Sequence, residues 1–210
     1  MKQGLFITLE GADGSGKTTQ MDRIVQFFEQ NKIDYIVTRE PGGMDLGQKI
    51  RDILLNYDGE VDSTCEMFLY LADRAQHMQT KIKKALAEGK VVLCDRHTDS
   101  TLAYQGYARG LDIDEINLLN NIATRGKKPD LTLLFDVDTS VAMQRVGNRA
   151  DKDRMESEGA KFHQKVRQGY LEIAKKEPER IKVVNSNLDI EAVWSQVSNL
   201  LRDFLNLQSK

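Results

Sequence analysis

The chain has little cysteine, and its two thiols cannot form a familiar redox or zinc motif. Of 210 residues only Cys65 and Cys94 are cysteine, too far apart for a C-x-x-C pair. The few histidines offer no pair at metal-ligand spacing either. We therefore expect two buried, unpaired thiols in a cytoplasmic, reducing compartment.

The chain also lacks long apolar runs, linkers and a strong net charge. No stretch is apolar enough to span a bilayer, and no apolar secretion signal opens the sequence. The net charge of −2 provides no field for nucleic acid or a membrane surface, which favours small-molecule substrates. No repeat or Pro/Gly/Ser-rich linker interrupts the chain, so we expect a single domain over residues 1–210.

Strand-like and helical segments alternate along the sequence. The apolar, β-branched segments are residues 5–10, 34–39, 90–94, 130–136 and 181–184. This order predicts an α/β fold in which helices flank both faces of a five-stranded parallel sheet. In such sheets ligands bind beyond the carboxyl ends of the strands, and we look for the site there.

The stretch from Gly11 to Thr18 fits the phosphate-binding pattern G-x-x-x-x-G-K-[ST] in full, between a predicted strand and a predicted helix. Glycines let consecutive N–H groups turn into one concavity, and the start of the helix adds its positive end. We predict a polyphosphate cradle in which Lys17 reaches the β- and γ-phosphates and Thr18 ligates magnesium. The alternative is a glycine-rich turn that contains a lysine by chance.

A second polar stretch begins where the predicted strand over 90–94 ends. A carboxylate there, Asp95, is typical of a group that orients magnesium beside a phosphate loop, and Arg96 can bind phosphate oxygens in a bidentate manner. The next helical turns carry groups suited to a base or a sugar: Ser100, Thr101, Tyr104 and Gln105. Without a phosphate loop, these residues would indicate only the capped start of an amphipathic helix.

Three other charged positions are ambiguous on their own. Arg39-Glu40-Pro41-Gly42-Gly43 follows a predicted strand, but a charged pair there is more often a solvated turn than a site. Arg51 in a predicted helix is by itself a surface charge. Arg74 borders an enclosed apolar turn over 67–72, where it either extends to solvent or binds a planar or anionic group.

A charge-dense segment follows Arg145, with Gly147 at its entry. We interpret residues 146–158 as a mobile lid whose arginines, among them Arg149 and Arg154, close over phosphates and support charge that spreads during transfer. A solvated loop of mixed charge is the alternative. Residues 185–187, at the end of the last predicted strand, could border an adenine ring.

Together these motifs resemble the thymidylate kinase family, whose members phosphorylate dTMP to dTDP with ATP and thereby supply dTTP for DNA synthesis. The resemblance covers essentially the whole chain. It depends on the phosphate loop, on residues 39–43 and 71–77, and above all on Asp95-Arg96-His97 followed by Ser100 and Ala103-Tyr104-Gln105-Gly106. Other P-loop kinases do not share that last block.

The resemblance implies a P-loop NTPase fold, a homodimer, and a magnesium ion held by Thr18 and Asp95. The implied dTMP site comprises Asp13, Glu40, Arg51, Tyr70, Arg74, Arg96, Ser100, Thr101, Tyr104 and Gln105. The implied ATP site comprises Gly11, Ala12, Asp13, Gly14, Ser15, Gly16, Lys17, Thr18, Thr19 and Arg145. The implied catalytic residues are Asp13, Lys17, Arg96, Arg149 and Arg154.

Within the implied dTMP site the family gives each residue a role. Asp13 approaches the 3′-hydroxyl, and Glu40 the acceptor side and its magnesium environment. Arg51 and Arg96 hold the acceptor phosphate. The thymine lies on Tyr70, with Arg74 and Gln105 at its edge, and Ser100, Thr101 and Tyr104 line the rest of the pocket.

Two positions depart from the family pattern. Gly14 stands where one class of these kinases carries an arginine, so the resemblance favours the class whose lid supplies the catalytic arginine. Met44 stands where threonine is usual, which changes the hydrogen bonding of that turn. Two other functions stay open: a deoxynucleoside kinase, which would need a base to activate a neutral hydroxyl, and a P-loop switch or ATPase that signals to a partner protein.

Overall fold

The computed structural model describes residues 4–147 and 153–207. Its sheet contains five parallel strands in the order β2-β3-β1-β4-β5. The strands are β1 (Phe6–Glu10), β2 (Tyr35–Arg39), β3 (Val91–Asp95), β4 (Leu131–Asp136) and β5 (Ile181–Asn185). Every predicted strand is present, with bounds that differ by one residue at most, and the predicted α/β fold is confirmed.

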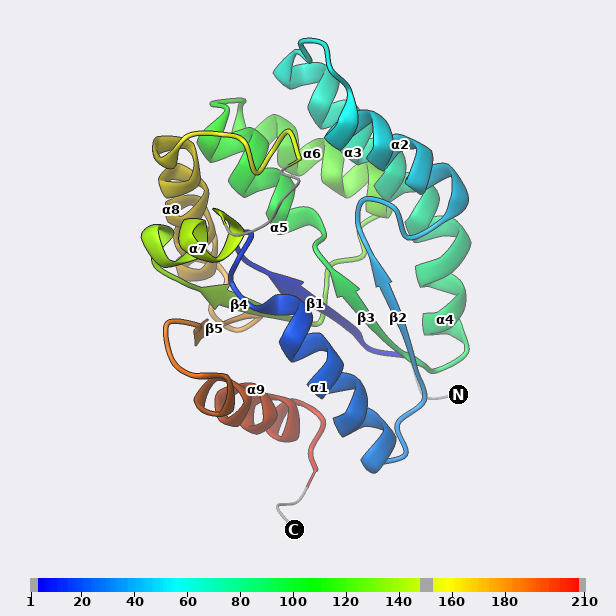
Figure 1. Cartoon of the computed structure of the whole chain (residues 1–210). Helices are drawn as coiled ribbons and strands as arrows, with labels where there is room; N and C mark the ends of the chain where they lie inside the picture. The colour runs from blue at the N-terminus through cyan, green and yellow to red at the C-terminus, as the bar shows by residue number, and fades with distance from the viewer. Residues whose placement is uncertain (1–3, 148–152, 208–210) are drawn as a thin grey trace.

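Alternation along the strands divides the apolar side chains between the two faces of the sheet. Ile7 and Leu9 of β1 belong to the cluster that packs under α1 (Lys17–Gln30) and α9 (Ile190–Phe204). Phe6, on the opposite face, packs instead against Met78 and Ile82. Figure 1 shows α1 and α9 together on one side of the sheet, and most of the other helices on the other side.

A nearly continuous helix runs from residue 63 to residue 87 on that second face. It consists of α3 (Ser63–His77), the π-helical segment η1 (Met78–Ile82) and α4 (Lys83–Ala87). A shorter helix has the same construction, with α5 (Thr98–Thr101) leading into the π-helical segment η2 (Leu102–Ala108). π-helical turns are rare and often occur at functional sites, and η2 carries Tyr104 and Gln105.

The remaining helices complete this face: α2 (Asp45–Asn56), α6 (Ile113–Thr124), α7 (Thr139–Gly147) and α8 (Ala160–Lys176). Their core is a cluster that includes Leu71, Leu102, Ile116 and Tyr170. No helix within residues 4–147 and 153–207 combines the length and apolarity needed to cross a membrane.

The expectation of two buried thiols is half wrong. Cys94 in β3 is buried, but Cys65 is exposed. Cys65 lies in the first turn of α3, where its amide donates to the capping carboxylate of Asp62 while its side chain faces solvent.

Candidate active site

The predicted phosphate loop has the backbone that a cradle of N–H groups requires. Gly11, Gly14 and Gly16 have φ values of 138°, 79° and 86°, in the region that favours glycine. A Cβ atom on Gly11 would lie 2.5 Å from the Phe135 carbonyl oxygen, so β4 also leaves no space for a side chain there. The helix α1 begins at Lys17, immediately after Gly16, and directs its N-terminus into the concavity.

The Lys17 ammonium folds back over this loop. Its Nζ donates to the carbonyl oxygens of Gly11 and Ala12 at 2.9 and 3.1 Å. Burial, together with the charge of Arg96, lowers the pKa of Lys17 to about 8, against the opposing charge of Asp95. Among the described residues these two carbonyl oxygens are the hydrogen-bond partners of Lys17 Nζ, and phosphate oxygens can replace them.

Asp95 and Thr18 are the two residues that the sequence predicts to hold a magnesium ion beside the loop. Asp95 ends β3, beside Leu9 of β1, and its Oδ1 is buried without a hydrogen-bond partner among the described residues. Thr18, the second residue of α1, is exposed. A carboxylate oxygen without a partner and an exposed threonine hydroxyl are oxygen donors of the kind that magnesium prefers.

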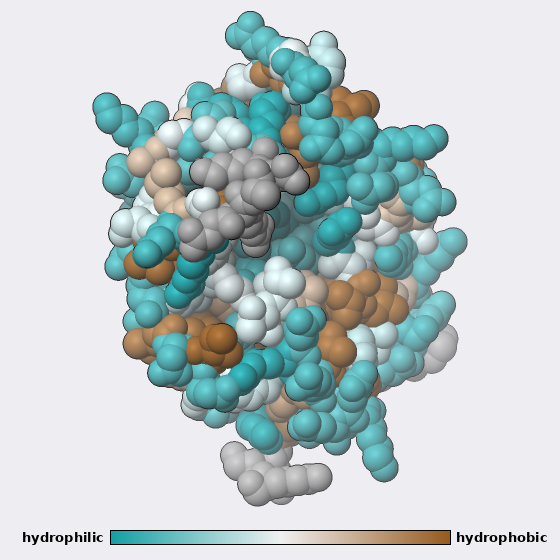
Figure 2. Space-filling view, viewed as in Figure 1, coloured by the Kyte–Doolittle hydropathy of each residue, from teal (hydrophilic) through white to brown (hydrophobic). Residues whose placement is uncertain are grey.

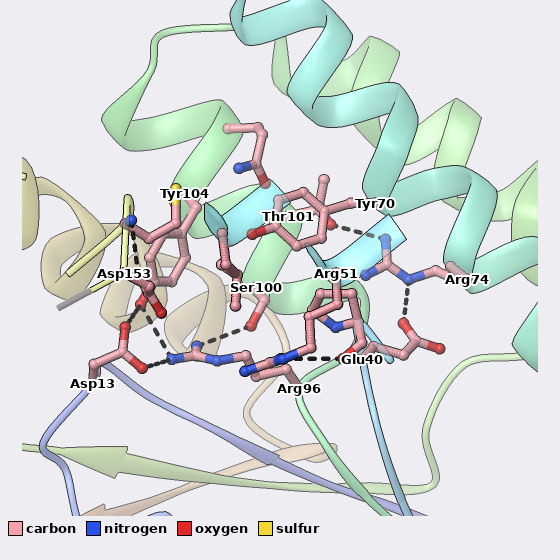
Figure 3. Close-up of a pocket in the computed structure, with 14 residues that line it drawn as sticks. Asp13, Glu40, Arg51, Tyr70, Arg74, Arg96, Ser100, Thr101, Tyr104 and Asp153 are labelled. Carbon is pink, nitrogen blue, oxygen red and sulfur yellow. Dashed lines mark hydrogen bonds and ion pairs between the residues drawn. The ribbon is translucent and has the colours of Figure 1, made fainter. Parts of the chain in front are cut away.

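Arg96 connects the phosphate loop to the neighbouring pocket. Its backbone has a φ of 65°, an unfavourable value for a side chain with a Cβ. Its guanidinium donates to Gly11 O at 3.0 Å, to Asp13 Oδ1 at 2.6 Å and to the hydroxyl of Ser100 at 3.3 Å (Figure 3). Burial alone would raise the pKa of the Asp13 carboxyl, but the charges of Arg96 and Lys17 bring it below its usual range.

Arg74 is held by a shell of polar groups in the interior. Only 1% of it is exposed, and it donates to Glu40, Thr101, Asn120 and the carbonyl oxygen of His97 at 2.7–2.9 Å. A guanidinium has five N–H groups. These four bonds leave one N–H, on Nη2, without a partner among the described residues.

Glu40 is less available than the family role implies. It lines the pocket, but its oxygens already face Arg74, His77 and His97 at 2.9–3.0 Å. Glu40 therefore fixes Arg74 in place, and these three partners account for its burial without a magnesium ion.

One pocket brings together every residue of the implied dTMP site. It has a volume of about 520 Å³, partly open to solvent, and lies beyond the carboxyl ends of β1, β2 and β3. Its further lining residues, not predicted from the sequence, are Pro41, Leu55, Asp153 and Met155. Figure 2 shows a hollow with hydrophilic lining near the centre of this face of the molecule.

Arg51 enters this pocket from α2 and donates to the Pro41 carbonyl oxygen at 3.1 Å. Burial and the charges of Arg39 and Arg96 lower the pKa of the Arg51 guanidinium, against the charge of Asp153. Cations that repel one another at the end of a pocket form a site for an anion.

A second cavity, of about 590 Å³, opens on the other side of the phosphate loop. Its lining includes Ser15 and Gly16 of the loop, Thr19 of α1, and Arg145 and Ser186 beyond them. Arg145 donates to the Gly14 carbonyl oxygen at 3.2 Å and to that of Ser186 at 3.4 Å. Of the residues predicted for the ATP site, Ser15, Gly16, Thr19 and Arg145 thus line this cavity.

Of the two arginines predicted in the lid, the structure describes only Arg154. Arg149 lies outside the described residues. Arg154 contacts α2 and α3: its Nε donates to the Leu54 carbonyl oxygen at 2.9 Å, and its Nη2 lies 2.5 Å from Glu66 Oε2. It makes no hydrogen bond to residues 11–18 within the described part of the chain.

Sequence reasoning missed two buried residues below the site, Glu10 and Tyr170. The Glu10 carboxylate accepts from the His97 amide at 2.8 Å, from Ser100 Oγ at 2.6 Å and from the Tyr170 hydroxyl at 3.0 Å. Burial and the charge of Asp99 raise the pKa of Glu10 to about 7. Glu10 could have been predicted as a site residue, because it is a carboxylate at the end of the strand that precedes the phosphate loop. Tyr170 could not, because nothing in the sequence distinguishes it from the other residues of the amphipathic helix α8.

Residues 31–34 read N-K-I-D and thus fit the guanine-binding pattern N-K-x-D of GTPases. They connect the end of α1 to the start of β2, at the edge of the sheet opposite the phosphate loop. They cannot reach a base whose phosphates lie in that loop.

Met44, which stands where the family usually has threonine, precedes α2, and its sulfur accepts a hydrogen bond from Thr80 Oγ1 at 2.6 Å.

Comparison with known proteins agrees with this geometry. The family model described as thymidylate kinase matches residues 9–197. A thymidylate kinase from Clostridium novyi is 45% identical over 205 residues, covering 96% of this chain and all of its own length. One from Desulfosudis oleivorans is 50% identical over 190 residues, 87% of this chain and 89% of its own. The crystal structure of thymidylate kinase from Ehrlichia chaffeensis is similar with a TM-score of 0.77 and 37% identity, covering 95% of this chain and 99% of that one.

Proposed function

Since this chain belongs to the thymidylate kinase family and phosphorylates dTMP to dTDP with ATP, we propose that the pocket between Arg51 and Gln105 binds dTMP. The observation that carries this assignment is the gradient across the pocket. Arg51 makes no ion pair with a described residue, and it lies with Arg96, the partner of Asp13, at the end beside the phosphate loop, whereas polar groups suited to a base lie at the other (Figure 3). The 5′-phosphate thus lies beside the loop, with thymine on Tyr70 and the 3′-hydroxyl near Asp13.

ATP binds on the other side of the same loop. Residues 11–19 hold its phosphates, and Arg145 and the segment 185–187 border the adenine. Thr18 and Asp95 would hold a magnesium ion, which would neutralise charge on the phosphates. The unsatisfied Oδ1 of Asp95 and the loop backbone support this arrangement.

The reaction needs positioning and charge neutralisation more than a base, because the acceptor oxygen of dTMP is already anionic. That oxygen attacks the γ-phosphorus in line, the bond from the γ-phosphorus to the bridging oxygen breaks, and ADP leaves. Lys17, Arg96 and a lid arginine, Arg149 or Arg154, surround the transferred group. Closure of a lid over residues 146–158 excludes water and prevents futile hydrolysis of ATP.

A coupled assay of ADP release tests the dTMP site. We expect Arg51→Met to raise the KM for dTMP by at least about tenfold, since a charged hydrogen bond contributes about 1.5–3 kcal/mol. The KM for ATP should change little. A variant with an unchanged KM for dTMP would refute the assignment of the acceptor phosphate to Arg51.

The same assay checks the two alternatives that the sequence motifs alone left open. Turnover of thymidine in preference to dTMP would indicate a deoxynucleoside kinase. ADP release that does not depend on any added monophosphate would indicate an ATPase or a switch.

We further propose a homodimer, one domain per chain, that works in the cytoplasm. The packed helices α3 and α6 expose large apolar side chains, with Phe68, Leu118 and Ile122 at 52%, 61% and 62% exposure. A second copy of the chain would bury them. Analytical ultracentrifugation of Leu118→Glu should give a monomer where the unmodified chain gives a dimer. The free thiols of Cys65 and Cys94 fit a reducing compartment.

A further inference from the structure

Glu66 is a buried carboxylate beside the pocket, and the reaction described above assigns it no role. It lies in the first turn of α3 and is 0% exposed. It accepts hydrogen bonds from Gln105 Nε2 at 2.8 Å and from Arg154 Nη2 at 2.5 Å. Arg109 adds two more, from Nε at 3.3 Å and from Nη2 at 3.2 Å.

These partners keep Glu66 ionised and immobile. Burial raises the pKa of its carboxyl, but the hydrogen bonds from Gln105, Arg109 and Arg154 outweigh burial and hold the pKa below its usual range. The two arginines are themselves braced. Arg109 Nη1 lies 2.5 Å from Glu158, and Arg154 Nε donates to the Leu54 carbonyl oxygen.

An ionised carboxylate can only accept hydrogen bonds. Gln105 must therefore turn its NH₂ group toward Glu66, and its carbonyl oxygen is the atom left for the pocket that it lines. No described residue donates a hydrogen bond to that oxygen. A glutamine without such a partner could present either end of its amide.

We propose that Glu66 is a positioning residue that sets base selectivity by holding the acceptor end of Gln105 toward the base. The proposal rests on the dTMP site proposed above. Thymine and uracil offer an N3–H donor and an O4 acceptor on this edge, whereas cytosine offers an N3 acceptor and an N4 donor. A fixed acceptor on Gln105 beside a fixed donor on Arg74 matches the first pattern and opposes the second at both positions.

The test is the ratio of kcat/KM for dUMP to that for dCMP in the Glu66→Gln variant. Neither nucleotide carries the 5-methyl group, so the ratio depends only on the N3 and C4 positions of the base. We expect it to fall at least about tenfold, the size of one misplaced hydrogen bond, because the amide of Gln105 can then turn either way. The ratio of dTMP to dUMP should stay at its original value, since both share that edge.

Glu158→Gln is the matched control. It removes an equal charge from Arg109 without touching Gln105, and the dUMP to dCMP ratio should be unchanged. A Glu66→Gln variant that folds and keeps the original ratio overturns the proposal. If that variant does not fold, Glu66→Asp retains the charge but withdraws it from Gln105 by one methylene group. An original ratio in that variant overturns the proposal as well.

Gln105→Ala separates this proposal from its premise. If the ratio does not change when the Gln105 amide is removed, the base does not lie against Gln105, and the proposed dTMP site is wrong. If the ratio collapses in Gln105→Ala but persists in Glu66→Gln, the dTMP site stands and only the role of Glu66 is refuted.

Discussion

Replacing Glu40 by glutamine should strongly destabilise the fold, because its carboxylate is the counter-charge of an arginine that is removed from water. Arg74 Nε lies 2.9 Å from Glu40 Oε2, and the two side chains are 1% and 2% exposed. The Nδ1 atoms of His77 and His97 face the same carboxylate at 2.9 and 3.0 Å. Glutamine keeps the shape of the side chain but removes its charge and adds a donor where donors already converge.

The expected magnitude follows from burial. Removal of one partner from a buried ion pair costs about 3–5 kcal/mol, because the other charge remains without compensation. A chain of this size loses about 2–4 °C of melting temperature per kcal/mol. We therefore expect the melting temperature of Glu40→Gln to fall by roughly 6–20 °C.

Thermal unfolding followed by circular dichroism at neutral pH measures this effect. The control is Glu172→Gln, which removes a carboxylate from an exposed pair with Lys175 and should leave the melting temperature unchanged. A Glu40→Gln variant that melts with the unmodified protein would refute the reasoning, since Arg74 would then not depend on this carboxylate.

The acid dependence provides a second measurement of the same pair. Burial raises the pKa of the Glu40 carboxyl, but the charges of His97 and Arg74 outweigh it and hold the pKa well below 4.5. A folded-state pKa below the unfolded value gives stability that is complete above about 4.5 and is lost as the pH falls. The melting temperature of the unmodified protein should therefore decline more steeply below that pH than that of Glu40→Gln.

Three further changes probe the loop, the metal site and the buried acid. Lys17→Ala should lower kcat at least about a hundredfold, and near-normal formation of dTDP would contradict the role of Lys17. Asp95→Asn should raise the magnesium concentration needed for half-maximal activity by about 10–100-fold, and an unchanged requirement would remove Asp95 from the metal site. Because the pKa of Glu10 is raised from 4.5 to about 7, its contribution to stability is complete below 4.5 and is lost as the pH rises through 7. Glu10→Gln should flatten that decline in melting temperature, and an unaltered pH profile would show that Glu10 does not titrate there.

Local features of the fold were predictable because they depend on short-range physics. The strands are apolar runs bounded by turn residues, and the loop is a run of glycines whose positive φ values other residues rarely adopt. The exposure of Cys65 was not predictable in this way, because the first turn of a helix can face either the core or solvent. The composition of this segment does not show whether Cys65 faces the core or solvent.

The site shows the same division. The residues of the implied dTMP site come from separate stretches of the chain, and resemblance to a family grouped them before the structure did. Resemblance could not show that Glu40 faces Arg74, His77 and His97, or that Arg154 reaches Glu66. Those pairings join residues far apart in sequence. The chain has many acidic and basic residues, and the sequence does not show which of them meet.

The sequence alone determined the order of strands and helices along the chain and the phosphate-loop motif, and it predicted which groups handle phosphate, since each depends on neighbouring residues. The tertiary structure decided which of those groups are free. Lys17 donates to backbone carbonyl oxygens of the loop, and Asp95 Oδ1 has no hydrogen-bond partner among the described residues, so both groups are available to a ligand. The carboxylates of Glu40 and Glu66 are instead hydrogen-bonded to Arg74 and Gln105. The physical reason is burial: a charge out of water must find its partner inside the protein, and only the packed fold determines which one it meets.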